Sequence, residues 1–293
     1  MPLKMLLAAL AALTVFFIIM LFRAARGRPA GDRVPSSGTA ATGLFTAFFD
    51  TLGIGSFATT TSIARHWRLI DDADLPGTLN VGITLPTMLQ AFIYTRLIPV
   101  DARTLILMIT ASVAGAWLGA GVVSRWPKVR IQVGMGTALV IAAATMLGAL
   151  LSLLPVGGTA LALTGPKLVV AVGGNFVLGA LMTLGIGLYA PCMILVSLLG
   201  LTPAAAFPIM MGSCAFLMPV ASVRFIRTGR YDLRASLGLA LGSIPGVLLA
   251  AFIVKSLPLT AVRVLVIVVV LYTAAGLLRA ALRDRMPAIA TPA

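Results

Sequence analysis

The residues of this sequence with the types and spacing to do chemistry gather at two glycine pairs inside long apolar runs. One pair lies in Gly53-Ile54-Gly55 and the other in Gly185-Ile186-Gly187. Each glycine costs about 1 kcal/mol relative to alanine in a helix interior. A helix interrupted at matching places in two repeats presents free N–H groups and a positive dipole end, which suit an anion.

Polar side chains beside each pair could complete such a site. Thr51, Ser56 and Thr59 accompany the first pair, and Thr183 and Pro191 accompany the second. Pro191 donates no backbone hydrogen bond, which favours a break there. Small residues also allow close helix packing in membranes, and for a single pair that interpretation would be preferred. The duplication favours a broken-helix binding site.

Asp50 is the one acidic residue deep inside an apolar run. A carboxylate at the bilayer centre costs roughly 2.5–3.5 kcal/mol on insertion scales, so it indicates function. Asp50 could accept a proton, coordinate a coupling cation, or cap a helix end by accepting bonds from Gly53 or Ile54. Met182 takes its place in the second half, so the predicted site is asymmetric.

Other polar residues carry weaker predictions. Asn80 and Ser213 could complete a cavity between the halves, together with Thr84 and Cys214, or bond their own helices, and Asn175 has the same two interpretations. Helix N-caps are expected at Asp101 and Asp232, with a substrate gate as the alternative. His66 is expected to be an interfacial anchor, and a solvated acidic loop is expected at Asp71, Asp72 and Asp74. No paired carboxylates, nucleophile with a base, phosphate loop or metal cluster stands out. The sequence therefore predicts neither an enzyme nor a cofactor.

Composition places these residues in a bilayer. Of the 293 residues, 60% are hydrophobic and 10% charged, with a mean hydropathy of +1.07, whereas about a quarter of a soluble domain is charged. Long continuous runs favour helices over a β-barrel. The 22 Lys and Arg lie mostly between the runs, as the positive-inside rule expects, so nucleic-acid binding is not predicted. Nine segments are expected, at 3–22, 40–64, 79–97, 103–123, 131–154, 168–198, 205–226, 235–254 and 259–281.

An internal repeat organises these segments. The first glycine stretch precedes the second by almost the same interval as Asp101-Ala102-Arg103 precedes Asp232-Leu233-Arg234. Two blocks whose intervals agree within one residue predict a duplicated four-segment unit behind one extra transmembrane helix. The expected parts are an N-terminal anchor with a cytoplasmic linker, a first repeat, an inter-repeat loop, a second repeat and a cytoplasmic tail, at 1–39, 40–154, 155–167, 168–281 and 282–293.

Basic residues help to decide between a parallel and an inverted repeat. If all nine segments cross fully, the side that holds Arg23 to Arg33 carries 14 of the 22 Lys and Arg. If 40–64 and 168–198 are re-entrant or broken, that side carries 16, and the second half is inverted relative to the first. The positive-inside rule favours the inverted arrangement by this margin of two. Both arrangements put the N-terminus outside and the C-terminus in the cytoplasm.

Residues 40–281 resemble the TauE/SafE family, sulfite-exporter-type permeases that are grouped with toluene-sulfonate uptake permeases. The resemblance rests on the duplicated four-helix unit, on the glycine-containing broken segment opening each half, and on the run from Gly43 to Phe57 (GLFTAFFDTLGIGSF). It implies movement of sulfite, sulfonates or related sulfur-containing organic anions across the cytoplasmic membrane. By position, the glycine-rich openings match Gly53, Gly55, Gly185, Gly187 and Pro191. Thr59 in place of a first-half proline, and Asp50, depart from many members.

The sequence as a whole predicts an all-α polytopic membrane protein of the bacterial cytoplasmic membrane that transports a small, sulfur-containing anion, coupled to protons through Asp50. Its partners would be the anion and the lipid bilayer, with a homo-oligomer also compatible. A non-transporting scaffold or assembly protein, and a passive anion channel, are the alternatives. The expected substrate site comprises Thr51, Gly53, Gly55, Ser56, Thr59, Asn80, Thr183, Gly185, Gly187, Pro191 and Ser213.

Overall fold

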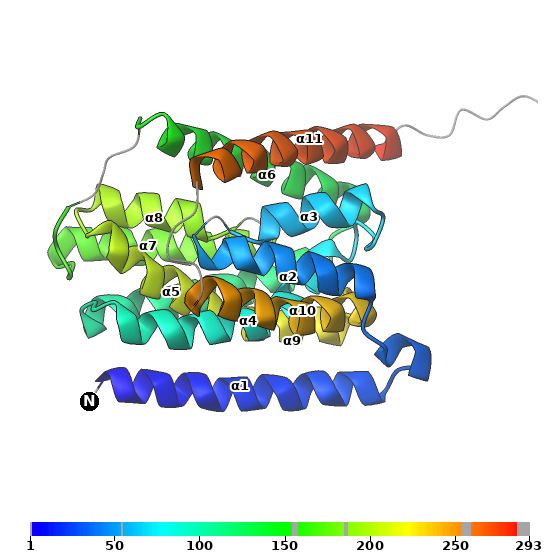
Figure 1. Ribbon diagram of the computed structural model, residues 1–293, viewed down its shortest axis with the longest axis horizontal. Helices are drawn as coiled ribbons and strands as arrows, with labels where there is room; N and C mark the ends of the chain where they lie inside the picture. The colour runs from blue at the N-terminus through cyan, green and yellow to red at the C-terminus, as the bar shows by residue number, and fades with distance from the viewer. Residues whose placement is uncertain (1, 54, 154–157, 185–186, 253–258, 286–293) are drawn as a thin grey trace, which may run out of the picture.

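The computed structural model describes residues 2–53, 55–153, 158–184, 187–252 and 259–285, and this part of the chain is helical without a strand. Five helices in it are long and apolar enough to cross a membrane. This confirms the expected all-α membrane protein. These helices are α1 (Pro2–Arg26), α5 (Ala102–Val123), α7 (Gly165–Met182), α9 (Ala206–Thr228) and α10 (Leu233–Phe252) (Figure 1).

The segments 40–64 and 168–198 are each interrupted. In the first, α2 (Ser37–Thr51) ends before α3 (Phe57–His66) begins. Gly53 and Gly55 between them have φ values of +88° and +90°, which glycine adopts at little cost. In the second, α7 is followed by α8 (Tyr189–Leu198), while Gly185 and Ile186 lie outside the described residues, as does Ile54. The α2–α3 hairpin opens towards the right of Figure 1, and the α7–α8 hairpin opens towards the left.

Helices from the N-terminal half of the chain pack on helices from the C-terminal half. Besides the helices already named, these include α4 (Leu75–Leu97), α6 (Lys128–Leu150) and α11 (Leu259–Arg285). Helix α2 packs on α10 and α7 packs on α5, while α4 packs on α9 and α6 on α11. The same interval along the chain separates the starts of α4 and α9, of α5 and α10, and of α6 and α11.

Glycines allow α2 to approach α10 closely and α5 to approach α7 closely. A Cβ atom on Gly246 of α10 would meet the carbonyl of Leu44 in α2, and one on Gly115 of α5 would meet the carbonyl of Phe176 in α7. Gly115 and Gly246 occupy equivalent positions in their helices, because each is the same number of residues from its helix start. Small residues at these crossings bring the helix backbones together, the usual basis of packing between helices in lipid.

We expect Gly179→Ala in α7 to lower the melting temperature of the purified protein. Its Cβ would collide with the backbone of Ser112 in α5, and such overpacking costs about 1–3 kcal/mol. A methyl group added to Gly173 on the same helix would meet nothing within 4 Å beyond its chain neighbours and the nearby backbone of its own helix, so Gly173→Ala should be neutral or stabilise by up to about 1 kcal/mol. Equal melting temperatures for the two variants would contradict the close crossing.

The helix caps agree with the sequence, but the acidic loop does not. The carboxylates of Asp101 and Asp232 accept N–H bonds of 2.9 Å from Thr104 and Ala235, which confirms both N-caps. Asp72, expected in a solvated loop, instead pairs with Arg65 through two bonds of 2.7 and 2.9 Å.

This ion pair ties the end of α3 to the rest of the protein. Gln132 of α6 donates a further 3.0 Å bond to Asp72. Burial of Asp72 opposes its ionised form, but the hydrogen bonds from Arg65 and Gln132 outweigh this effect and hold its pKa below the usual value. Asp71 beside it is exposed, as expected. The loop that follows α3 is therefore anchored to α6 rather than solvated throughout.

Candidate functional site

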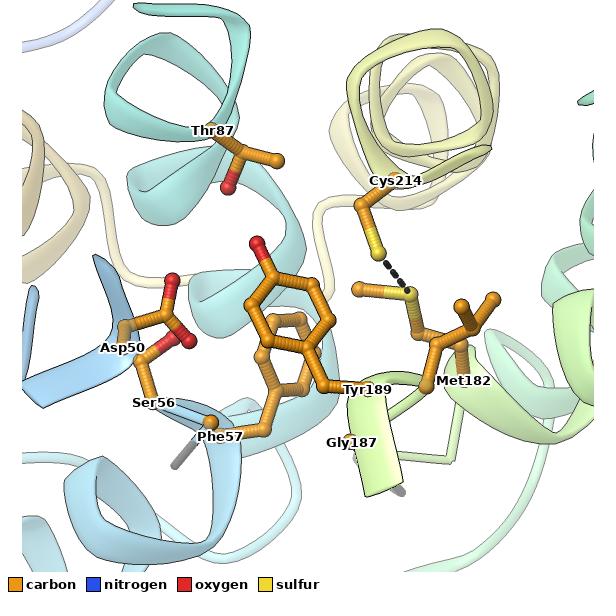
Figure 2. A pocket seen from close by; sticks show the side chains of 10 residues that line it. Asp50, Ser56, Phe57, Thr87, Met182, Gly187, Tyr189 and Cys214 are labelled. Atoms are coloured by element: carbon orange, nitrogen blue, oxygen red, sulfur yellow. Dashed lines mark hydrogen bonds between the residues drawn. The ribbon is translucent and has the colours of Figure 1, made fainter. Parts of the chain in front are cut away.

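The two helix interruptions meet at one small cavity between α4 and α9 (Figure 2). Its volume is about 10 Å³, which is room for a single water. No basic side chain is among the described residues that form its wall. They are Asp50, Gly55, Ser56, Phe57, Thr87, Met182, Gly187, Leu188, Tyr189 and Cys214.

Asp50 is the charged group of this cavity, and its side chain is bonded to Gln90. It is only 3% exposed. Its Oδ2 atom accepts a 2.9 Å bond from the Nε2 atom of Gln90 in α4. Ser56 lines the cavity beside it. Figure 2 shows Asp50 and Ser56 on one side of Tyr189, with Met182 and Cys214 on the other.

The carboxylate lies close to the N-terminus of α3. Ser56 is the N-cap residue of that helix and lines the cavity together with Asp50, and a helix N-terminus favours a negative group. The N–H of Gly53 instead bonds the backbone carbonyl of Asp50 at 2.9 Å. The predicted cap bond from Gly53 to the Asp50 side chain is therefore not formed, and Ile54, the other predicted donor, lies outside the described residues. An ionised Asp50 fills the place that an external anion would take at the start of α3.

The second interruption lacks such a carboxylate. Met182 stands where Asp50 stands in the first half, and its sulfur accepts a 3.4 Å contact from the thiol of Cys214. Leu188, the N-cap residue of α8, supplies no side-chain cap bond. Gly187 and Leu188 both line the cavity. Within the described residues, the N-terminus of α8 is therefore the end without a negative group.

Gln90 connects the two interruptions. Its amide nitrogen donates to Asp50 and, at 2.9 Å, to the hydroxyl of Thr51, and its carbonyl oxygen accepts a 2.8 Å bond from the Tyr189 hydroxyl of α8. The Tyr94 hydroxyl donates to the Thr51 carbonyl at 2.8 Å. Neither Gln90 nor Tyr94 was expected from the sequence. Gln90 lies inside the expected segment 79–97, so the cost of a polar group in the bilayer, which marked Asp50, could have marked it too.

Several predicted site residues bond their own helices. Thr59 donates to the Ser56 carbonyl at 2.9 Å, and Thr183 donates to the Ala180 carbonyl at 2.7 Å. Thr51 donates in the same way to the Ala47 carbonyl at 2.7 Å. None of the three lines the cavity. Pro191 lies in the first turn of α8, where a missing N–H costs little, so the interruption precedes it.

Of the residues expected to complete the cavity, Cys214 lines it, whereas Asn80, Thr84 and Ser213 lie outside its wall. Asn80 donates to the Pro76 carbonyl of its own helix at 2.8 Å. The hydroxyl of Ser213 accepts a 2.9 Å bond from Asn175, whose amide also bonds the Met108 carbonyl at 2.7 Å. Asn175 therefore fastens α7 to α5 and α9. The Asn80 amide, by contrast, bonds only its own helix.

Comparison with protein-family models, with curated proteins and with solved structures gave no match. Any functional assignment therefore depends on the residues and geometry of the cavity.

Proposed function

We propose that this protein is a secondary transporter of a small anion, of the sulfite or sulfonate class, and a permease of TauE/SafE type. The observation that carries the proposal is the meeting of two interrupted helices at one buried polar cavity. Transporters place substrates where discontinuous helices end near the middle of the bilayer. In the proposed site the backbone N–H groups at the start of α8 bind the anion, because no basic side chain lines the cavity in the described residues.

We further propose that the core is an inverted repeat. The reciprocal pairing of α2 with α10 and of α7 with α5 supports a two-fold relation between the halves. The opposite openings of the α2–α3 and α7–α8 hairpins support inversion (Figure 1). This arrangement puts 16 of the 22 Lys and Arg on the side where α1 ends. By the positive-inside rule that side is the cytoplasm of a bacterial cell, and the N-terminus is outside.

Asp50 couples anion binding to a proton in this proposal. An ionised Asp50 repels an anion in the cavity, and the repulsion between two unit charges 4 Å apart is about 4 kcal/mol at an effective dielectric constant of 20. Protonation of Asp50 removes the repulsion, and Ser56, which lines the cavity at the N-terminus of α3, can then donate to the anion. Proton and anion therefore bind together, and acidic pH raises the affinity for the anion.

The cavity as observed is a closed state. Its 10 Å³ accommodate a water but no sulfonate. An anion therefore enters when one hairpin moves away from α4 and α9. Gly53 and Gly55, with their positive φ values, are suitable hinge residues in the first hairpin.

Uptake by proteoliposomes tests the proposal. We expect saturable uptake of a labelled small sulfonate, accelerated by a proton gradient that is acidic outside, because proton and anion bind together. A sulfonate is the suitable probe since its own charge does not change with pH over the physiological range. A scaffold protein would give no uptake above empty liposomes. A passive channel would give flux that neither saturates nor responds to the proton gradient, and either result would contradict the proposal.

A further inference from the structure

A groove of about 450 Å³ lies between α1 and α9, away from the cavity at the helix interruptions. Helix α1 lies at one edge of the bundle (Figure 1). It is held there by a narrow strip of buried residues, Leu10, Phe17 and Leu21. Beside this strip the side of α1 that includes Phe16 and Ile19 stays open, with these side chains 51% and 47% exposed. The groove is therefore open sideways to the hydrocarbon of the bilayer.

The groove has one charged end and an apolar remainder. Arg23 is in the last turn of α1, and Arg227 is in the last turn of α9. Both arginines line the groove, and no acidic side chain is among its described lining residues. Neither guanidinium has a side-chain hydrogen bond or an ion pair within the described part of the chain. Two guanidinium groups that line one groove and have no acidic partner there can bind a phosphate together.

The apolar part extends from these arginines towards the middle of the membrane. On α1 it runs from Arg23 back to Phe16, seven residues or about 10 Å at 1.5 Å per residue. The facing wall is made by Val223 and Ile226 of α9. A soluble anion gains nothing from such walls, whereas a lipid places its acyl chain along them and its phosphate at the arginines. Basic sites between transmembrane helices bind anionic headgroups in this way.

We propose that an anionic phospholipid of the phosphatidylglycerol kind binds in this groove. Its phosphate contacts Arg23 and Arg227, and one acyl chain lies between α1 and α9. The lipid thereby adds contacts between α1 and the rest of the bundle. The site is independent of the proposed transport activity, because none of its lining residues belongs to the cavity at the helix interruptions.

Native mass spectrometry of the full-length protein tests this proposal. The protein is exposed in detergent to equal amounts of phosphatidylglycerol and phosphatidylcholine with the same acyl chains. We expect at least tenfold preference for phosphatidylglycerol, and expect the Arg23→Gln/Arg227→Gln double variant to lose it. Arg26→Gln/Arg125→Gln removes the same charge from exposed positions outside the groove and should keep the preference. Glycerol phosphate, the headgroup without chains, should not compete.

A second variant tests the apolar half without changing charge. Val223→Trp fills the groove, so it should also reduce phosphatidylglycerol binding at least tenfold while the arginines remain. Equal binding of the two lipids by the unmodified protein would overturn the proposal. So would a preference that survives in the Arg23→Gln/Arg227→Gln variant, or one lost equally in the control. Competition by glycerol phosphate would assign the arginines to a soluble phosphate instead.

Discussion

Asp50→Asn is expected to make sulfonate uptake independent of pH. Asparagine keeps the size of the side chain and can accept the same bond from Gln90, but it carries no charge at any pH. The variant therefore resembles the protonated form, which accepts the anion. Unmodified protein should lose at least about tenfold in apparent affinity between acidic and alkaline pH, since the like-charge repulsion exceeds the roughly 1.4 kcal/mol that corresponds to tenfold.

Uptake measured across a pH series, with the proton gradient collapsed, separates this role from others. Asp32→Asn is the matched control, because Asp32 is exposed in a short turn outside the helices of the core. It should leave the pH profile unchanged. A profile retained in Asp50→Asn would remove the coupling role from Asp50 while leaving the anion site intact. Uptake that requires sodium ions instead of protons would assign the carboxylate to a coupling cation.

Gln90→Leu should cause the largest loss of both stability and uptake. Leucine leaves Asp50, Thr51 and Tyr189 without the partner that joins them, all three being at most 5% exposed. Each buried polar group left without a partner costs about 1–3 kcal/mol, so the melting temperature should fall by several degrees. The sulfonate uptake rate should fall at least about tenfold, because an error of about 1 Å in a binding geometry costs on that scale or more.

Asn80→Leu is the control for this variant, since Asn80 is buried in the same helix. Its amide bonds only its own helix, and its carbonyl oxygen has no hydrogen-bond partner in the described structure. Replacing it with leucine should therefore be close to neutral. If Asn80→Leu and Gln90→Leu had the same melting temperature and uptake, the hydrogen bonds of Gln90 would contribute to neither stability nor transport.

Local features of the fold were predictable from the sequence. Apolar length marked the membrane helices, Asp before a helix marked both N-caps, and Gly53 and Gly55 marked an interruption between α2 and α3. The substitution of Met182 for Asp50 also predicted that only one interruption carries a charge. Each of these features depends on residues that are near one another in the chain.

Features that depend on distant partners were not predictable. Gln90 bonds Asp50, 40 residues away in the sequence, and Tyr189, 99 residues away. Residue spacing does not predict contacts over such sequence separations. The prediction of a solvated acidic loop was wrong for the same reason, because Asp72 accepts a bond from Gln132, which is 60 residues away in the sequence. Asn80 was a candidate for the cavity because it is polar, but its i−4 carbonyl already satisfies its amide. The small size of the cavity depends on side-chain packing, which the sequence pattern does not specify.

Locating a bound anion tests the proposed site most directly. Bromoethanesulfonate carries a bromine atom whose anomalous scattering marks its position in a crystal. At a concentration that saturates uptake, we expect one bromine peak between Ser56 and Gly187, at the N-termini of α3 and α8. A peak elsewhere, or no peak at that concentration, would contradict the binding of anions at the helix interruptions.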